Sequence, residues 1–107
     1  MIMRIWHGWT SGENADKYEA LLNEEIFIGI ADRRIPGYYG IQLLRRETGR
    51  EVEFVTIMKF RDLNSVREFA GEDYKTAVVP TNARALLARF DRCSQHYEIR
   101  AELLAES

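Results

Sequence analysis

Two histidines are the side chains of this sequence whose ordinary pKa lies closest to neutrality, and they stand far apart as His7 and His96. Without a nearby cluster of cysteine or acidic residues, they do not have the spacing of a metal site. The sequence contains no glycine-rich phosphate loop and no Ser-His-Asp order. Cys93 is the single cysteine, and we expect it to be a small buried hydrophobic residue rather than a nucleophile. The pattern predicts no metal and no cofactor, and leaves proton transfer to a histidine.

The composition is that of an ordinary globular protein, with 46% hydrophobic and 30% charged residues. Its 107 residues suit a single domain over 1–107. The formal net charge of -2 argues against a nucleic-acid partner, and we interpret the basic pairs at 33–34 and 45–46 as solvated surface. No stretch reaches the roughly 20 apolar residues of a membrane span. A lone thiol is typical of a reducing compartment, so we expect a cytoplasmic protein without membrane contact.

The elements that would position these side chains follow from periodicity and from turn residues. We predict a strand over 2–10, a helix from an Asn14 cap to about residue 25, and an ambiguous stretch that Pro36 and Gly37 end. A hairpin over 38–46 and 51–60 follows, and then a helix that Asp62 caps and Gly71 ends. A short helix over 83–90 and a strand over 93–101 complete the chain. This order predicts an α+β, ferredoxin-like βαββαβ protomer with an antiparallel sheet.

The third predicted strand carries apolar residues on both of its faces. Phe54 and Met58 share one face, whereas Val55 and Ile57 share the other. The helices of this fold cover only one face, and an uncovered apolar side chain forfeits roughly 1.5–3 kcal/mol. We therefore predict a homodimer with its two sheets packed face to face. The alternative is that loops or the C-terminal tail cover the second face.

Five segments in order resemble the antibiotic biosynthesis monooxygenase family of dimeric α/β-barrel proteins. They are "MIMRIWHGWT", "PGYYGIQLLRR", "FVTIMKF", "FAGEDYKTAV" and "HYEI". The resemblance implies a ferredoxin-like protomer, a dimeric α/β barrel, and a pocket between sheet and helices in each protomer. Some members are cofactor-free oxygenases of aromatic polyketides or quinols, and others degrade heme. It also implies that residues 72–80 border the pocket, although a plain connector explains that segment equally well.

A cofactor-free oxygenase needs a dry pocket for an aromatic substrate, a base for its phenolic proton, and donors for the developing oxyanion. The aromatic and arginine candidates are Arg4, Trp6, Trp9, Phe60, Phe69 and Tyr74, and all except Trp9 form our predicted substrate-binding set. Trp6 and His7 alternate along one strand, and the resemblance places Trp6, with Arg4 beside it, in the pocket. His96 is the predicted catalytic base. The alternative is that it is hydrogen-bonded at a dimer interface or in solvent.

Heme-degrading members carry an Asn, a Trp and a His where this chain has Trp6, Phe60, and Val78 or Val79, so the resemblance does not extend to heme. Two functions stay open. One is a cofactor-independent monooxygenase that acts on a small aromatic or quinol. The other is a non-catalytic, dimeric small-ligand-binding protein on the same scaffold.

Overall fold

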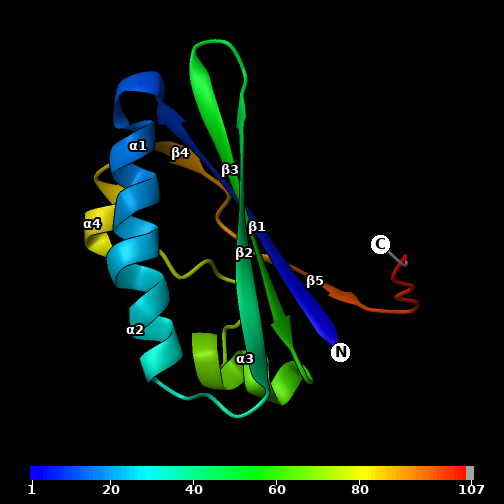
Figure 1. Ribbon diagram of the computed structural model, residues 1–107. Coiled ribbons are helices and arrows are strands. Elements are labelled where there is room, and N and C mark those ends of the chain that lie inside the picture. The colour runs from blue at the N-terminus through cyan, green and yellow to red at the C-terminus, as the bar shows by residue number, and fades with distance from the viewer. Residues whose placement is uncertain (106–107) are drawn as a thin grey trace.

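The computed structural model describes residues 1–105, which form one five-stranded antiparallel sheet with helices on one side (Figure 1). The strands are β1 (Ile2–Ser11), β2 (Tyr38–Glu47), β3 (Glu51–Phe60), β4 (Leu87–Phe90) and β5 (Gln95–Glu98). The helical segments are α1 (Gly12–Leu21), η1 (Leu22–Ile26), α2 (Phe27–Asp32), α3 (Leu63–Ala70) and α4 (Thr81–Arg84). The strand order is β2-β3-β1-β4, and β5 also pairs with β1. The predicted ferredoxin-like fold is confirmed.

The hairpin and the third helix form where their local signals place them. β2 and β3 are joined by a turn in which Gly49 has a φ of 91°, a conformation that glycine adopts without strain. Asp62 caps α3 by accepting the backbone N–H of Ser65 at 2.9 Å. Gly71 ends the helix with a φ of 92°. These predictions are confirmed to within a residue or two.

The first helical region is longer than predicted and has a different cap. Ser11 is the N-cap, and its hydroxyl accepts the backbone N–H of Asn14 at 3.2 Å. The region then continues through the π-helical turn η1 and through α2 to Asp32. Ile26 and Phe27 pack against the buried core of the sheet. Burial of this apolar face outweighs the strand propensity of the sequence, so the stretch that was ambiguous in the sequence is helical as far as Asp32.

The last third of the chain differs most from expectation. The predicted helix over 83–90 is wrong: α4 ends at Arg84, and Leu87–Phe90 pair with β1 as β4. The final strand β5 is shorter than predicted and pairs with the other half of β1. Cys93 is exposed rather than buried, because its neighbour Ser94 takes the inward position at 5% exposure. Two short strands, β4 and β5, pair with the edge of β1 that β3 leaves free. The periodicity of a sequence does not show that such an edge is available for pairing.

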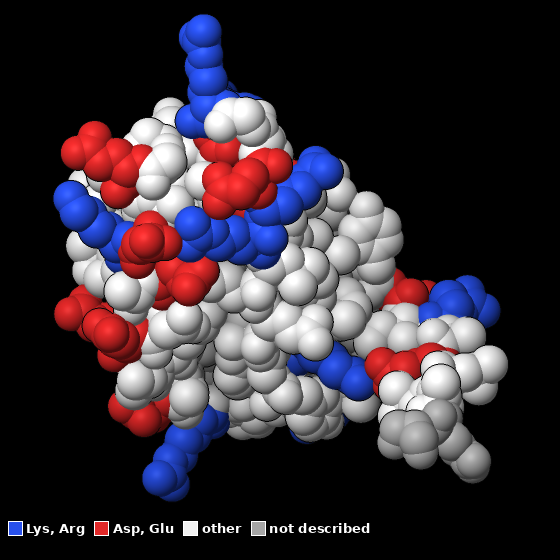
Figure 2. All heavy atoms as spheres, turned by 45° about the horizontal axis from the view of Figure 1, so that its top comes forward, with Lys and Arg blue, Asp and Glu red and all other residues white. Residues whose placement is uncertain are grey.

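The core lies between the sheet and the helices, in two clusters centred on Tyr18 with Phe54 and on Phe60 with Val66. Within the described part of the chain, no helix covers the opposite face of the sheet (Figure 1). On that face Ile5 lies opposite Ile57. Charged side chains gather toward the end that carries the β2–β3 turn, and the middle of the molecule is largely uncharged (Figure 2). None of the helices among residues 1–105 has the length and apolar character needed to cross a membrane.

Candidate functional site

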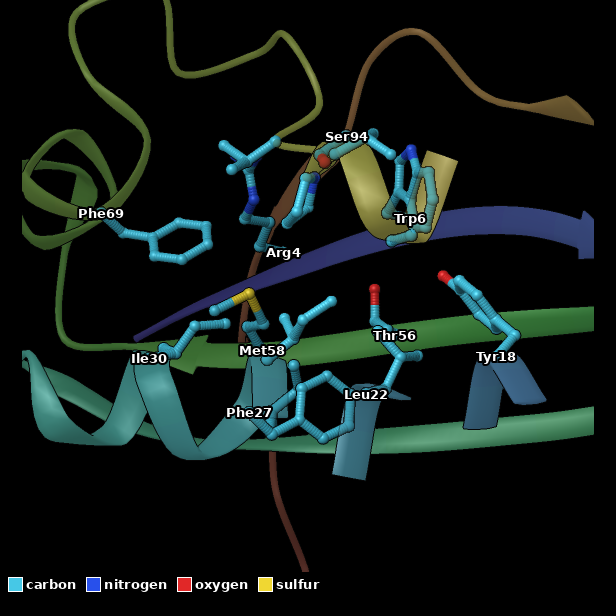
Figure 3. Close-up of a pocket in the computed structure, with 16 residues that line it drawn as sticks. Arg4, Trp6, Tyr18, Leu22, Phe27, Ile30, Thr56, Met58, Phe69 and Ser94 are labelled. Atoms are coloured by element: carbon cyan, nitrogen blue, oxygen red, sulfur yellow. The ribbon is translucent and has the colours of Figure 1, made fainter. Parts of the chain in front are cut away.

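A cavity of about 60 Å³ lies between the helix-covered face of the sheet and the helices (Figure 3). It is lined by Arg4, Trp6, Tyr18, Leu22, Ile26, Phe27, Ile30, Ile41, Thr56, Met58, Phe69, Val78, Val79, Pro80, Ala83 and Ser94. Arg4 is the one charged residue in this lining, which contains no carboxylate, lysine, histidine or cysteine. The wall is therefore mainly apolar and aromatic, with three hydroxyl groups and one cation.

Arg4 comes from β1 and is only 3% exposed. Its Nη1 donates to the backbone carbonyl of Tyr74 and lies 2.9 Å from Nε2 of His96, and its Nη2 donates to the carbonyl of Thr76 at 3.4 Å. The guanidinium also lies 5.5 Å from the ring centroid of Phe69. Burial lowers the pKa of Arg4 to about 10, so the side chain stays charged at neutral pH.

Trp6 and Phe69 stand at opposite ends of the cavity, with Arg4 between them (Figure 3). The Trp6 indole N–H donates to the backbone carbonyl of Asp91 at 2.6 Å, which fixes the ring orientation. Phe69 comes from α3 and is half-buried. Two aromatic walls of this kind suit a flat apolar ligand. Trp6 and Arg4 share this side of β1, as the alternation with His7 predicted.

His96 lies outside the cavity, beyond Arg4. Because a guanidinium can only donate, Nε2 of His96 accepts the hydrogen bond from Arg4. Burial, together with the positive charges of Arg4 and Lys75, lowers the pKa of His96 to about 4. The imidazole is thus neutral at physiological pH, and its lone pair at Nε2 is occupied. In this geometry His96 orients Arg4 and does not face the space that a substrate would occupy.

Two other predicted substrate contacts also lie away from the cavity wall. Phe60 is fully buried in the core behind Phe69, with the two ring centroids 5.9 Å apart. The Tyr74 ring packs edge-on against His96 at 5.1 Å, and these two side chains line a shallow surface hollow. Tyr74 reaches the site only through the carbonyl that accepts from Arg4.

Three hydroxyl residues in the cavity lining were missed by sequence reasoning: Tyr18, Thr56 and Ser94. Thr56 had a readable signal, because it interrupts an apolar face of β3 on which Phe54 and Met58 are its neighbours. Tyr18 is a buried residue of α1. Burial raises its pKa, which favours the neutral phenol as a hydrogen-bond donor. Ser94 carried no pattern that distinguishes it from a loop serine.

The segment after α3 borders the site. Val78, Val79 and Pro80 line the cavity, while Tyr74 and Thr76 supply carbonyls to Arg4. On the helical side the wall includes Leu22 and Ile26, the first and last residues of the π-helical turn η1. Such turns occur often at functional sites. A second, open hollow lies outside the cavity and shares Ile26, Ile30, Phe69, Val78 and Pro80 with it.

Comparison with known proteins identifies the fold. No protein-family model and no curated protein matches this chain. Among solved structures the chain is similar to the heme-degrader MhuD from Mycobacterium tuberculosis, in a structure with two hemes bound in its active site. The TM-score is 0.62 at 16% identity, and the match covers 96% of this chain and 99% of that chain. At this identity the likeness shows a common ferredoxin-like fold.

The cavity residues do not fit heme. No histidine lines the cavity, and Val78 and Val79 occupy the segment after α3. Tyr18 is the one lining residue whose phenolate is a known type of iron ligand, and burial raises its pKa away from that form. A space of about 60 Å³ is also smaller than the roughly 150 Å³ that a benzene-binding cavity provides. The cavity therefore lacks both the ligands and the space for heme.

Proposed function

We propose that this protein is a cofactor-independent monooxygenase of the antibiotic biosynthesis monooxygenase type, acting on a small aromatic or quinol substrate. The observation that carries the proposal is an aromatic cavity, on the helix-covered face of the sheet, with the buried guanidinium of Arg4 in its wall. The fold shared with a heme-degrading protein supports the scaffold, and the resemblance in sequence supports the reaction class. The substrate would be smaller than heme.

In this proposal the role of each residue follows from its position in the site. Trp6 and Phe69 would hold the substrate ring between them, and Arg4 would donate to the oxygen on which negative charge develops. His96 would keep Arg4 in place through its Nε2 contact, so it acts as a positioning residue. With a hydroquinone, one oxygen atom of O2 would enter the ring to give a hydroxyquinone. The second oxygen atom would leave as water with two substrate hydrogens.

Oxygen uptake tests this function directly. A panel of single-ring dihydroquinones, including electron-poor members that ionise near neutral pH, is added to the protein, and O2 consumption is followed with product mass. We expect consumption above the buffer rate and one added oxygen atom in the product. Arg4→Gln is expected to abolish the excess uptake, whereas Arg84→Gln, an exposed change near Phe90, is expected to leave it intact. Uptake at the buffer rate across the panel would reject the proposal.

A second candidate function is non-catalytic binding of a small ligand. It is favoured by the cavity lining, which holds no carboxylate or imidazole that could take a substrate proton. Saturable ligand binding without O2 consumption would select this alternative.

We also propose a homodimer that covers the open face of the sheet. There Val55 lies between Leu44 and His7, one row along from the pair of Ile5 and Ile57. Leu44 is 47% exposed, so this apolar band is only partly shielded within one chain. A second copy would bury the band and would not obstruct the cavity, which lies on the other face.

A further inference from the structure

Among residues 1–105, the cation in the cavity wall has no acidic partner. Arg4 is 3% exposed, yet its contacts are two backbone carbonyls and a neutral imidazole. Within residues 1–105 it makes no ion pair with any carboxylate. A buried charge without a counter-ion is costly, and buried charges in proteins are normally paired. The missing partner is a negative charge.

Arg4 also has hydrogen-bonding capacity to spare. A guanidinium carries five N–H donors in a planar fork. Three of them reach Tyr74, Thr76 and His96, and no contact within the described chain uses Nε or the second hydrogen of Nη2. An oxygen anion in the cavity would meet a cation that is already held in place by three contacts. Preorganised donors of this kind bind an anion without paying for their own ordering.

The other polar groups in the cavity wall match the same ligand. Tyr18, Thr56 and Ser94 bring hydroxyl groups, and Figure 3 shows the hydroxyl oxygens of Tyr18 and Thr56 directed toward the space between the helices and β1. Hydroxyl groups donate readily to an anion. The lining has no group that takes up a proton near neutral pH. The cavity can therefore receive an anion, but it cannot make one from an ordinary phenol, whose pKa is about 10.

We propose that the cavity selects single-ring aromatic ligands that arrive already ionised, as an acidic phenol or enol does at neutral pH, with the oxyanion on Arg4. This inference rests on the proposed function in one respect only: both place the ligand in the same cavity. Anion selection is a property of binding, and it holds whether or not oxygen is consumed. It also removes the need for a catalytic base in the cavity.

Room for the ring comes from the outer hollow. The cavity of about 60 Å³ is too small for an aromatic ring, which needs a space on the order of 150 Å³. Phe69 and Val78 stand between the cavity and the hollow and line both, so their movement would join the two spaces. Val78 is 49% exposed and Phe69 is half-buried, so neither is locked in the core.

The test compares an anion with its neutral analogue in the intact protein. The probe is 4-nitrophenol, which ionises near neutral pH with a change in absorbance, and the neutral analogue is 4-nitroanisole. Affinities are measured by calorimetry at pH 8, and the pKa of the bound probe is read from its spectrum. We expect the anion to bind at least about tenfold more tightly than the analogue, the contribution of one charge-assisted contact. The pKa of the bound probe is expected to fall below its value in water.

Three variants locate the effect. Arg4→Met is expected to equalise the two affinities, whereas Arg4→Lys keeps a preference for the anion. The matched control is Arg84→Met, since Arg84 also lies 5.5 Å from an aromatic ring, that of Phe90, but is exposed and lines neither the cavity nor the outer hollow. It should leave the preference unchanged. If Arg4→Met does not fold, the wild-type comparison of the two ligands still decides.

Equal affinities for the anion and the analogue, a bound pKa at or above that in water, or no saturable binding of the anion would each overturn the inference. So would an equal loss of the preference in Arg84→Met. Anion selection without O2 uptake from any dihydroquinone would reject the monooxygenase and keep the inference. O2 uptake without anion selection would reject the inference and keep the monooxygenase.

Discussion

Two charged residues lie on opposite faces of the same pair of strands, and their surroundings differ sharply. Glu53 of β3 is 7% exposed on the open face, and its carboxylate contacts His7 at 2.9 Å and Arg46 at 2.6 Å. These hydrogen bonds, His7 first, lower the pKa of Glu53. Arg4 of β1 is 3% exposed on the covered face and has only neutral acceptors.

The difference separates a structural charge from a functional one. On the open face the chain supplies both partners of the acid, so the charge is complete without any other molecule. On the covered face it supplies a positioned cation and leaves its counter-charge to a ligand. The unpaired buried charge lowers the stability of the fold, and it is available to bind a ligand, as is common for buried functional groups.

The largest expected effect is on stability, and it distinguishes a core residue of the covered face from a residue of the cavity wall. Phe60→Ala removes a fully buried ring and is expected to lower the free energy of unfolding by about 3–5 kcal/mol. Phe69→Ala should cost clearly less, because Phe69 is half-buried and borders a space that already exists. Urea unfolding of both variants measures the contrast. Equal losses would mean that Phe69 is ordinary core and that the cavity has no flexible wall.

The next effect concerns the open face. Ile57→Asp places a carboxylate in the centre of the proposed interface and is expected to raise the dimer dissociation constant by about a hundredfold or more. Ile28→Asp is the matched control, because Ile28 is 52% exposed on α2 and should leave assembly unchanged. Sedimentation velocity at micromolar concentration reads the outcome. A wild-type protein that sediments as a monomer would contradict the interface at once.

A smaller effect follows from the neutral histidine behind Arg4. The folded-state pKa of His96 is about 4, below its ordinary value of 6.5, so protonation favours the unfolded chain. Its contribution to stability is complete above pH 6.5 and is lost as the pH falls from 6.5 toward 4. His96→Gln keeps an acceptor for Arg4 and should flatten this part of the curve of unfolding free energy against pH. An NMR titration in which the folded His96 protonates at 6.5 would refute the assignment.

The smallest expected effect is the pH dependence of stability that Glu53 contributes on the open face. The pKa of Glu53 is lowered from its ordinary value of 4.5, so its stabilising contacts are complete above that pH and are lost as the pH falls through the lower folded value. Glu53→Gln is expected to reduce the loss of stability as the pH falls below 4.5. Glu24→Gln, an exposed change on η1, serves as the control in the same urea titrations. An identical curve for wild type and Glu53→Gln would show that the pair with His7 is not formed in solution.

Local signals predicted much of the fold. The cap at Asp62 and the glycines at 49 and 71 act within a few residues, so the hairpin and α3 could be read directly. β4 could not, because its pairing with Gly8 of β1 spans most of the chain and its residues also fit a helical period. In the same way, strand alternation placed Arg4 and Trp6 on one side, but the position of His96 beyond Arg4 depends on β5 pairing with β1.

The site was harder to predict than the fold because its defining property is an absence. The sequence shows Arg4 and many acids, and only the three-dimensional arrangement reveals that none of the described acids reaches this arginine. Sequence reasoning therefore looked for a base and chose His96. The geometry instead occupies that imidazole with Arg4, which moves attention from proton removal to anion binding.

The interrupted outer edge of the sheet has a consequence for the behaviour of the protein at high concentration. Beside β1 stand two separate pieces of four residues each, β4 and β5, with residues 91–94 between them. A long continuous border would offer an incoming chain an unbroken row of N–H and C=O groups, the template from which fibrils grow. Here such a chain would lose its register after one short piece. The same break that brings Ser94 inward thus protects this side of the molecule against aggregation.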